Sequence, residues 1–162
     1  MKNAKKYTYG LLRIFMGWIF FWAFIDKVFG LGFTTEPEKS WLVGGSPTMG
    51  FLKFGTKGPL AQIFQSIAGN GFVDWLFMLG LLLIGLSLIL GIGMKIATKS
   101  GSLLMLLMYL AAMPPEHNPI IDEHLVYILV LLNLKLNNAG NHLGLGNRWS
   151  NTTLVQKYPI LK

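Results

Sequence analysis

The sequence predicts an all-α integral membrane protein, a bundle of four transmembrane helices with a long, partly helical extracytoplasmic loop between the first two. Composition is the first reason: hydrophobic residues make up 52% of the chain and charged residues only 13%, about half the usual share in a soluble domain. Four apolar runs are the second, because each approaches the roughly 20 residues that a membrane helix needs. Residues 1–162 are therefore expected to form a single membrane domain.

The first apolar run predicts a membrane helix over about residues 9–29. It follows a short basic N-terminus, is rich in aromatic side chains, and is too long for the core of a signal peptide. Residues 30–71 form the expected outer loop, in which a short helix near Thr48–Lys53 and an amphipathic helix over Pro59–Ala68 each follow a proline start signal. The apolar content of this loop argues against disorder and favours an ordered cap.

Three further apolar runs predict the other membrane helices, over about residues 72–92, 96–113 and 119–136. Pro114 ends the third helix, because proline cannot continue it. The fourth is expected to begin with Asn118 as its N-cap and Pro119 at its first helical position. Residues 137–162 then form the expected cytoplasmic tail.

The distribution of charge sets the expected orientation. All seven acidic residues lie in segments on one side of the expected membrane, whereas the N-terminus, the turn at Lys95 and Lys99 and the tail carry basic residues and no acid. The positive-inside rule then predicts a multi-pass protein of the cytoplasmic (inner) membrane with both termini cytoplasmic. Because this topology accounts for the net charge of +7, the lipid bilayer is the expected partner and nucleic acid is not.

Asp26 is the most informative charged residue. It lies at the C-terminal end of an apolar helix, where the helix dipole and desolvation both disfavour a carboxylate. A compensating partner is therefore expected, although an interfacial carboxylate in water also fits the pattern. Lys27 is next in the chain and can cap the same helix end. We take Asp26 as a candidate catalytic residue and Lys27 as a candidate substrate-binding residue.

A second ionisable group, Asp122, Glu123 and His124, opens the fourth apolar run. The helix dipole favours the acids there with or without a function, but it disfavours a charged histidine, so His124 is expected to be neutral and able to carry a proton. Tyr127 lies one turn later on the same helix face. We expect this group to meet the end of the first span in one outward-facing polar pocket, with Glu123 and His124 catalytic and Asp122 and Tyr127 binding substrate.

A glycine turn in the outer loop is a candidate anion site. Gly45 and Ser46 precede a helix N-terminus within the turn Gly44–Thr48, whose backbone N–H groups can bind an anion, although an ordinary helix cap is the simpler interpretation. We assign both residues to substrate binding. Arg13, one turn inside the cytoplasmic end of the first span, is expected to reach lipid phosphates.

No metal or haem site is expected. The chain has no cysteine, which excludes thiolate ligands and disulfides. His117 and His124 are seven residues apart, but Pro119 between them makes one continuous helix through both unfavourable. The candidate cofactor is a quinone, as an electron acceptor.

Four segments in one order carry a resemblance to a known family: LLRIFMGWIFFWAFIDKVFG, WLVGGSPTMGFL, GNGFVDWLFMLGLLLIGLSLILGIGMKIA and DEHLVYILVLLNLKLNNAGNHLGLGNRW. Together they cover nearly the whole chain and resemble the DoxX family of four-span membrane proteins, and more narrowly the DoxD-like large subunit of thiosulfate:quinone oxidoreductase. The resemblance implies a membrane bundle that, in the two-subunit enzyme, passes electrons from thiosulfate to a membrane quinone, with tetrathionate as product. It also implies a small DoxA-like partner subunit.

The residues fit such chemistry. A quinone needs an apolar slot between helices and a few polar groups that deliver protons, which the aromatic first span with Asp26, Glu123, His124 and Tyr127 would supply. The alternative is a non-catalytic DoxX-type membrane scaffold or small-molecule carrier, in which the buried charges are structural pairs. Either protein could form a homo-oligomer.

The predicted orientation can be tested with cysteines introduced into the cysteine-free chain. Lys2→Cys and Lys99→Cys should be shielded from an impermeant thiol reagent in intact cells, whereas Glu36→Cys should be labelled, because positive ends stay in the cytoplasm. The measurement is labelling before and after permeabilisation. Labelling of Lys99→Cys but not of Glu36→Cys in intact cells would reverse the orientation.

Overall fold

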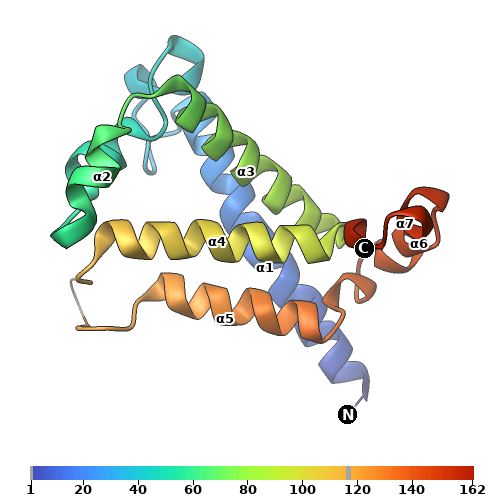
Figure 1. Ribbon diagram of the computed structural model, residues 1–162. Helices are drawn as coiled ribbons and strands as arrows, with labels where there is room; N and C mark the ends of the chain where they lie inside the picture. The colour runs from blue at the N-terminus through green and yellow to red at the C-terminus, as the bar shows by residue number, and fades with distance from the viewer. Residues whose placement is uncertain (1, 116–117) are drawn as a thin grey trace.

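The computed structural model describes residues 2–115 and 118–162, so Glu116 and His117 lie outside the described residues. Within these ranges the chain is all-helical, with no β-strand. Its long helices are α1 (Lys2–Phe29), α3 (Gly71–Leu90), α4 (Met94–Ala112) and α5 (Glu123–Leu136). Helices α1 and α3 form one antiparallel pair, α4 and α5 form another, and the two pairs cross (Figure 1).

Close packing between α1 and α3 depends on glycines. A Cβ added at Gly17 would lie 2.8 Å from the backbone nitrogen of Ile89, and one added at Gly85 would lie 2.7 Å from the nitrogen of Phe21. Small residues let two helix backbones approach in this way. The close approach puts Phe20 at the centre of the bundle beside fully buried side chains of the other long helices, which are Met78, Leu88, Leu131 and Leu134.

Two of the described helices are long and apolar enough to cross a membrane, judged by length and composition. They are α1, over Ala4–Phe29, and α3, over Gly71–Leu90. Only 28% and 33% of their apolar windows are buried, so most of these side chains face outward. An outward-facing apolar surface of this kind suits lipid better than water. This observation covers two spans and not four. Helix α5, for example, has 14 residues and a length of about 21 Å, which is shorter than a hydrocarbon core of about 30 Å.

The fourth long helix begins later than predicted, at Glu123 and not at Pro119. Asn118 does act as a cap, but its side chain accepts the N–H groups of Ile120 and Ile121 in a separate turn. The Tyr109 hydroxyl then donates to the carbonyl of Ile120 and holds the chain outside the helix. Asp122 becomes the N-cap of α5, because its carboxylate accepts the N–H of Leu125.

The segment between α1 and α3 is long and partly helical, as predicted. It contains 3-10 turns at Pro37–Lys39, Trp41–Val43 and Gly58–Leu60, a π-helical turn at Phe51–Gly55, and α2 at Ala61–Ser66. Trp41 packs edge-on against Trp75 of α3, with ring centroids 4.6 Å apart, and so ties this loop to the bundle.

The C-terminal segment is folded against one end of the bundle. After a 3-10 turn at Ala139–Asn141 it forms α6 (Gly146–Ser150), α7 (Thr153–Lys157) and a last 3-10 turn at Pro159–Leu161. The Trp149 indole donates to the carbonyl of Leu161 at 2.6 Å, and the Lys95 N–H at the start of α4 donates to the carbonyl of Lys162 at 2.8 Å.

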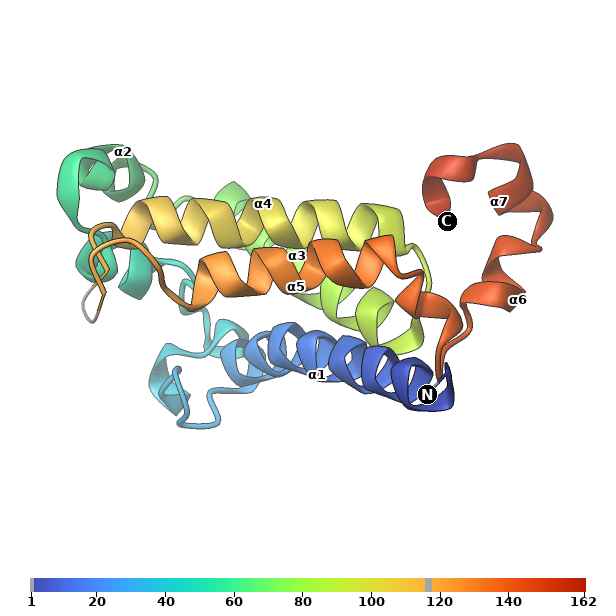
Figure 2. The same ribbon diagram turned by 90° about the horizontal axis from the view of Figure 1, so that it is seen from below.

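Charge is segregated between the two ends of the molecule. Figure 2 shows both termini and the C-terminal segment at one end, with α2, the long loop and the start of α5 at the other. Asp26 at the end of α1, Asp74 in the first turn of α3 and Asp122 at the N-cap of α5 all lie at this second end. The end with the termini is formed by segments that contain lysine and arginine but no acid.

Arg13 is completely buried, so the expectation that it reaches lipid phosphates is wrong. Its guanidinium donates to the carbonyls of Leu88 and Ile89 in the last turn of α3, and to those of His142 and Leu143 after α5. The last carbonyls of a helix lack hydrogen-bond donors within the helix, and Arg13 is the donor for two of those in α3. It thereby joins α1, α3 and the C-terminal segment.

Replacing Arg13 by methionine should therefore destabilise the fold. Arg13→Met keeps an unbranched side chain but leaves four carbonyls without their charged donor, so the free energy of unfolding should fall by on the order of 3 kcal/mol. Denaturant unfolding in detergent, followed by tryptophan fluorescence, measures this. Arg148→Met is the matched control, since Arg148 is exposed and its loss should change stability by about 0.5 kcal/mol or less. Equal losses in the two variants would contradict the structural role of Arg13.

Candidate functional site

A pocket of about 380 Å³ lies where the C-terminal half of α1 meets the loop that follows it. Trp18, Trp22 and Asp26 are four residues apart and therefore lie on one face of α1. The chain then turns back at Gly30 and Gly32, whose φ angles of 64° and 82° suit glycine. This turn returns the loop to the helix, and the full lining is Trp18, Ile19, Trp22, Ala23, Asp26, Phe33 and Thr34.

The walls of this pocket are aromatic. Trp18 and Trp22 stack with ring centroids 5.7 Å apart, and Phe33 meets Trp22 edge-on at 5.2 Å. Trp18 is 51% exposed and Phe33 is 72% exposed, so the pocket opens sideways from the outer surface of α1. A flat apolar ring can pack against the exposed faces of these side chains.

Asp26 forms the polar end of the pocket and is 1% exposed. Its carboxylate accepts the N–H of Phe33 at 3.2 Å, the N–H of Thr34 at 2.9 Å and the Thr34 hydroxyl at 2.7 Å. Lys27 donates to the same hydroxyl oxygen at 3.4 Å. The compensation expected for this carboxylate is present, and donors from the following loop provide it.

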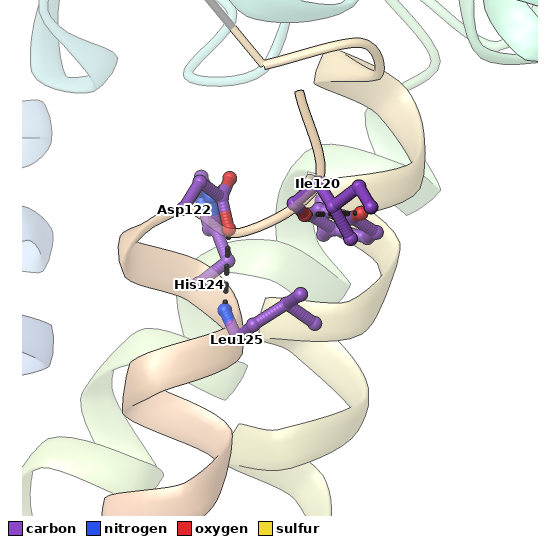
Figure 3. Close-up of polar contacts among 5 residues, drawn as sticks. Ile120, Asp122, His124 and Leu125 are labelled. Atoms are coloured by element: carbon purple, nitrogen blue, oxygen red, sulfur yellow. Dashed lines mark hydrogen bonds and ion pairs between the residues drawn. The ribbon is translucent and has the colours of Figure 1, made fainter. Parts of the chain in front are cut away.

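The second ionisable group lies at the start of α5 (Figure 3). One carboxylate oxygen of Asp122 lies 2.7 Å from Nδ1 of His124, and the other accepts the N–H of Leu125 at 3.2 Å. An ionised Asp122 requires the hydrogen on Nδ1, which leaves Nε2 of the neutral ring as an acceptor. The arrangement of Asp122 and His124 would allow a proton to pass between them. The other two predicted residues lie apart from this pair: Glu123 is exposed, and Tyr127 packs against the core.

Asp122, Glu123 and His124 also have a geometry that a cation could use. Their candidate ligand atoms all lie within 4.8 Å of one another. Three consecutive residues at one helix start supply fewer ligands than the four of a structural zinc site, and acids are favoured at such a position in any case. The group alone does not define a metal centre.

The two ionisable groups are bonded separately. In the described part of the chain, no hydrogen bond or ion pair joins Asp26 or Lys27 to Glu123 or His124. Both groups lie at the same end of the bundle, but each is satisfied by its own neighbours in sequence. Their convergence on a shared ligand stays a prediction.

The glycine turn of the outer loop already holds an anion, the carboxylate of Asp74. Oδ1 of Asp74 accepts the Ser46 hydroxyl at 2.9 Å, the Thr48 N–H at 3.1 Å and the Thr48 hydroxyl at 2.5 Å. Gly45 packs so tightly that an added Cβ would lie 2.1 Å from the carbonyl oxygen of Lys39. The turn binds an internal carboxylate through two hydroxyls and one backbone N–H, and substrate binding by Gly45 and Ser46 stays a prediction.

Sequence reasoning did not assign Trp18, Trp22, Phe33 or Thr34 to a site, nor Asp74 to the glycine turn. The spacing of Trp18, Trp22 and Asp26 was a usable signal, because residues four apart share a helix face. No comparable signal links Ser46 to Asp74, which are 28 residues apart.

Comparisons of the chain with models of protein families, with curated proteins and with solved structures find no match. The resemblance to the DoxX family therefore stays an expectation from the sequence.

A double-mutant cycle tests which partner compensates Asp26. Asp26→Asn and Thr34→Val should be non-additive by about 1 kcal/mol or more in the free energy of unfolding, since a hydrogen bond to a charged group contributes on that order. Asp26→Asn combined with His124→Gln should be additive within about 0.5 kcal/mol. Unfolding in detergent gives both values. Coupling of Asp26 to His124 but not to Thr34 would restore the single shared pocket and remove the loop as the partner.

Proposed function

We propose that this chain is a membrane subunit of an oxidoreductase that passes electrons from thiosulfate, or a related sulfur compound, to a membrane quinone. One observation carries the proposal: an aromatic pocket on the outward face of an apolar helix ends at a buried carboxylate and a hydroxyl. The resemblance to DoxD-like subunits is consistent with it. The quinone would occupy the pocket formed by Trp18, Trp22 and Phe33.

The shape and polarity of the pocket support a quinone head group. A quinone is a flat ring with a carbonyl oxygen at each end, so aromatic walls suit the ring and a donor suits one oxygen. Lys27 lies beside this end of the pocket, because its ammonium donates to the hydroxyl oxygen of the lining residue Thr34 at 3.4 Å, and its other hydrogens would be free to serve a quinone oxygen. Asp26, behind Thr34, would take part in proton delivery as the ring is reduced.

The sideways opening of the pocket supports a lipid-soluble ligand. In the proposed topology the four long helices cross the membrane, both termini are cytoplasmic, and the pocket lies toward the outer side. The outward apolar side chains of α1 and α3 agree with lipid around the pocket mouth. A quinone dissolved in the bilayer would then enter without crossing water.

The proposed reaction balances without an internal electron carrier. Two thiosulfate ions give up two electrons as they join through a new S–S bond to form tetrathionate, and the quinone takes up two electrons and two protons to form the quinol. A DoxA-like subunit, as the resemblance implies, would bring the donor to the quinone. Lys39 already forms an ion pair with Glu36 at 2.6 Å, and its hydrogen bond lowers the pKa of the Glu36 carboxyl. Lys53 of the outer loop is therefore better placed than Lys39 to attract an anion.

A second candidate, a non-catalytic scaffold or small-molecule carrier, is favoured by a different observation. Arg13, Asp26 and Asp74 are all buried, and each holds a loop or the tail in place through several hydrogen bonds. These structural roles are enough to explain why the three ionisable groups are buried, without a catalytic function. The two candidates differ in whether a bound quinone is reduced.

Quinone binding and reduction can be measured on the purified chain in lipid nanodiscs. Decyl-quinone should quench tryptophan fluorescence, and Trp22→Leu should raise its apparent Kd by about threefold to tenfold through loss of an aromatic wall. Phe15→Leu is the matched control, because Phe15 is an exposed aromatic residue of α1 that does not line the pocket. Equal affinity in Trp22→Leu and the control would remove the pocket as the quinone site.

Reduction is followed by quinone absorbance after thiosulfate is added, with and without a small partner subunit. Reduction that is lost in Asp26→Asn, while quinone still binds, would support the catalytic proposal. Binding with no reduction under either condition would contradict it and leave the carrier as the better function.

A further inference from the structure

A second pocket, of about 610 Å³, lies at the opposite end of the bundle from the aromatic pocket. Three segments far apart in sequence form it. Lys6 and Tyr7 come from the first turns of α1, Ile89 and Leu90 from the last turn of α3, and residues 141 and 143–145 from the segment after α5. Figure 2 shows these segments together at the end that holds both termini.

A buried cation lies directly beneath the floor of this pocket. Gly144, one of its lining residues, packs directly on the buried guanidinium of Arg13, since a Cβ added there would lie 2.8 Å from Nη2. All the described acceptors of Arg13 are neutral backbone carbonyls, and its Nε has no partner. The charge of Arg13 is therefore solvated by dipoles but not neutralised by a carboxylate.

The rim of the pocket adds a second charge of the same sign. Lys6 is exposed, and its side chain makes no hydrogen bond or ion pair within the described residues. The lining residues include no acid, and the sequence has none before Asp26, none between Asp74 and Glu116, and none after Glu123. A pocket with one cation on its rim, a second beneath its floor and no acid in its lining favours a negatively charged ligand.

The other wall of the pocket is apolar. Leu90 is 40% exposed, and Leu143 and Leu145 are 45% and 42% exposed. The N–H of Leu145 donates to the carbonyl of Leu90 at 2.8 Å, which fixes this wall against the end of α3. A free inorganic anion would leave the apolar wall in contact with water, whereas a ligand with both a charged head and a hydrocarbon tail would cover it.

We infer that this pocket binds an anionic phospholipid, with its phosphate near Lys6 and Asn141 and an acyl chain along Leu90 and Leu145. Asn141 lines the same pocket as Lys6 and has an amide group that can donate to a phosphate. The inference rests on the membrane location in the proposed function but not on quinone chemistry, since the two pockets lie at opposite ends of α1. The bound lipid would cover the point at which the tail joins the bundle.

The inference can be tested by the lipid dependence of thermal stability in detergent. Phosphatidylglycerol should raise the midpoint of unfolding, whereas phosphatidylcholine with the same acyl chains and sodium phosphate at the same concentration should not. Lys6→Gln should weaken the apparent affinity for phosphatidylglycerol about fivefold, the effect expected of one lysine near a lipid phosphate. Leu145→Gln should weaken it as well, because the tail loses part of its wall.

Lys5→Gln is the matched control. Lys5 is the preceding residue and carries the same charge, but it lies over the ring of Tyr9 and does not line the pocket. Equal weakening by Lys5→Gln and Lys6→Gln would show general surface attraction and overturn the inference, as would equal stabilisation by phosphatidylcholine. Stabilisation by free phosphate would indicate a small-anion site in place of a lipid site. Decyl-quinone affinity should be unchanged in Lys6→Gln, so failure of this inference and failure of the quinone proposal are separable.

Discussion

The buried guanidinium of Arg13 is the interaction on which the arrangement of this chain most depends. It lies at the C-terminal end of α3, where the helix dipole carries partial negative charge, so a cation is favoured there without a carboxylate partner. The same group also binds carbonyls of His142 and Leu143, at the far end of the sequence. Without it, the end of α3 and the segment after α5 would each present unsatisfied carbonyls inside an apolar structure, where such groups are costly.

Asp26 and Asp74 use the same principle with the charges reversed. Each carboxylate collects N–H and hydroxyl donors from irregular backbone: Asp26 from Phe33 and Thr34, and Asp74 from Ser46 and Thr48. Irregular loops next to apolar helices need such acceptors, because a buried N–H or hydroxyl group that cannot reach water must have a partner within the protein. A buried acid is thus first a structural requirement of this fold, and Asp26 differs from Asp74 mainly in facing an aromatic pocket.

The long helices could be predicted because their apolar runs are long and their ends carry strong signals. The start of α5 could not, since Asn118 and Asp122 are both good caps and a tertiary bond, from Tyr109 to Ile120, decides between them. The burial of Arg13 was also beyond local reasoning, because its partners are backbone carbonyls 75 to 130 residues away. Asp26 was singled out correctly from the helix dipole, but a loop eight residues later, and not a distant helix, compensates it.

The short form of α5 changes how this part of the chain would match a bilayer. Its 14 helical residues advance about 21 Å, well short of a hydrocarbon core of about 30 Å. The residues before it do not continue the helix, because Asn118 caps a separate turn and the Tyr109 hydroxyl binds the carbonyl of Ile120. A bilayer around α5 would therefore have to become thinner there, or the turn would have to be buried among its neighbours, so that its polar backbone does not meet lipid.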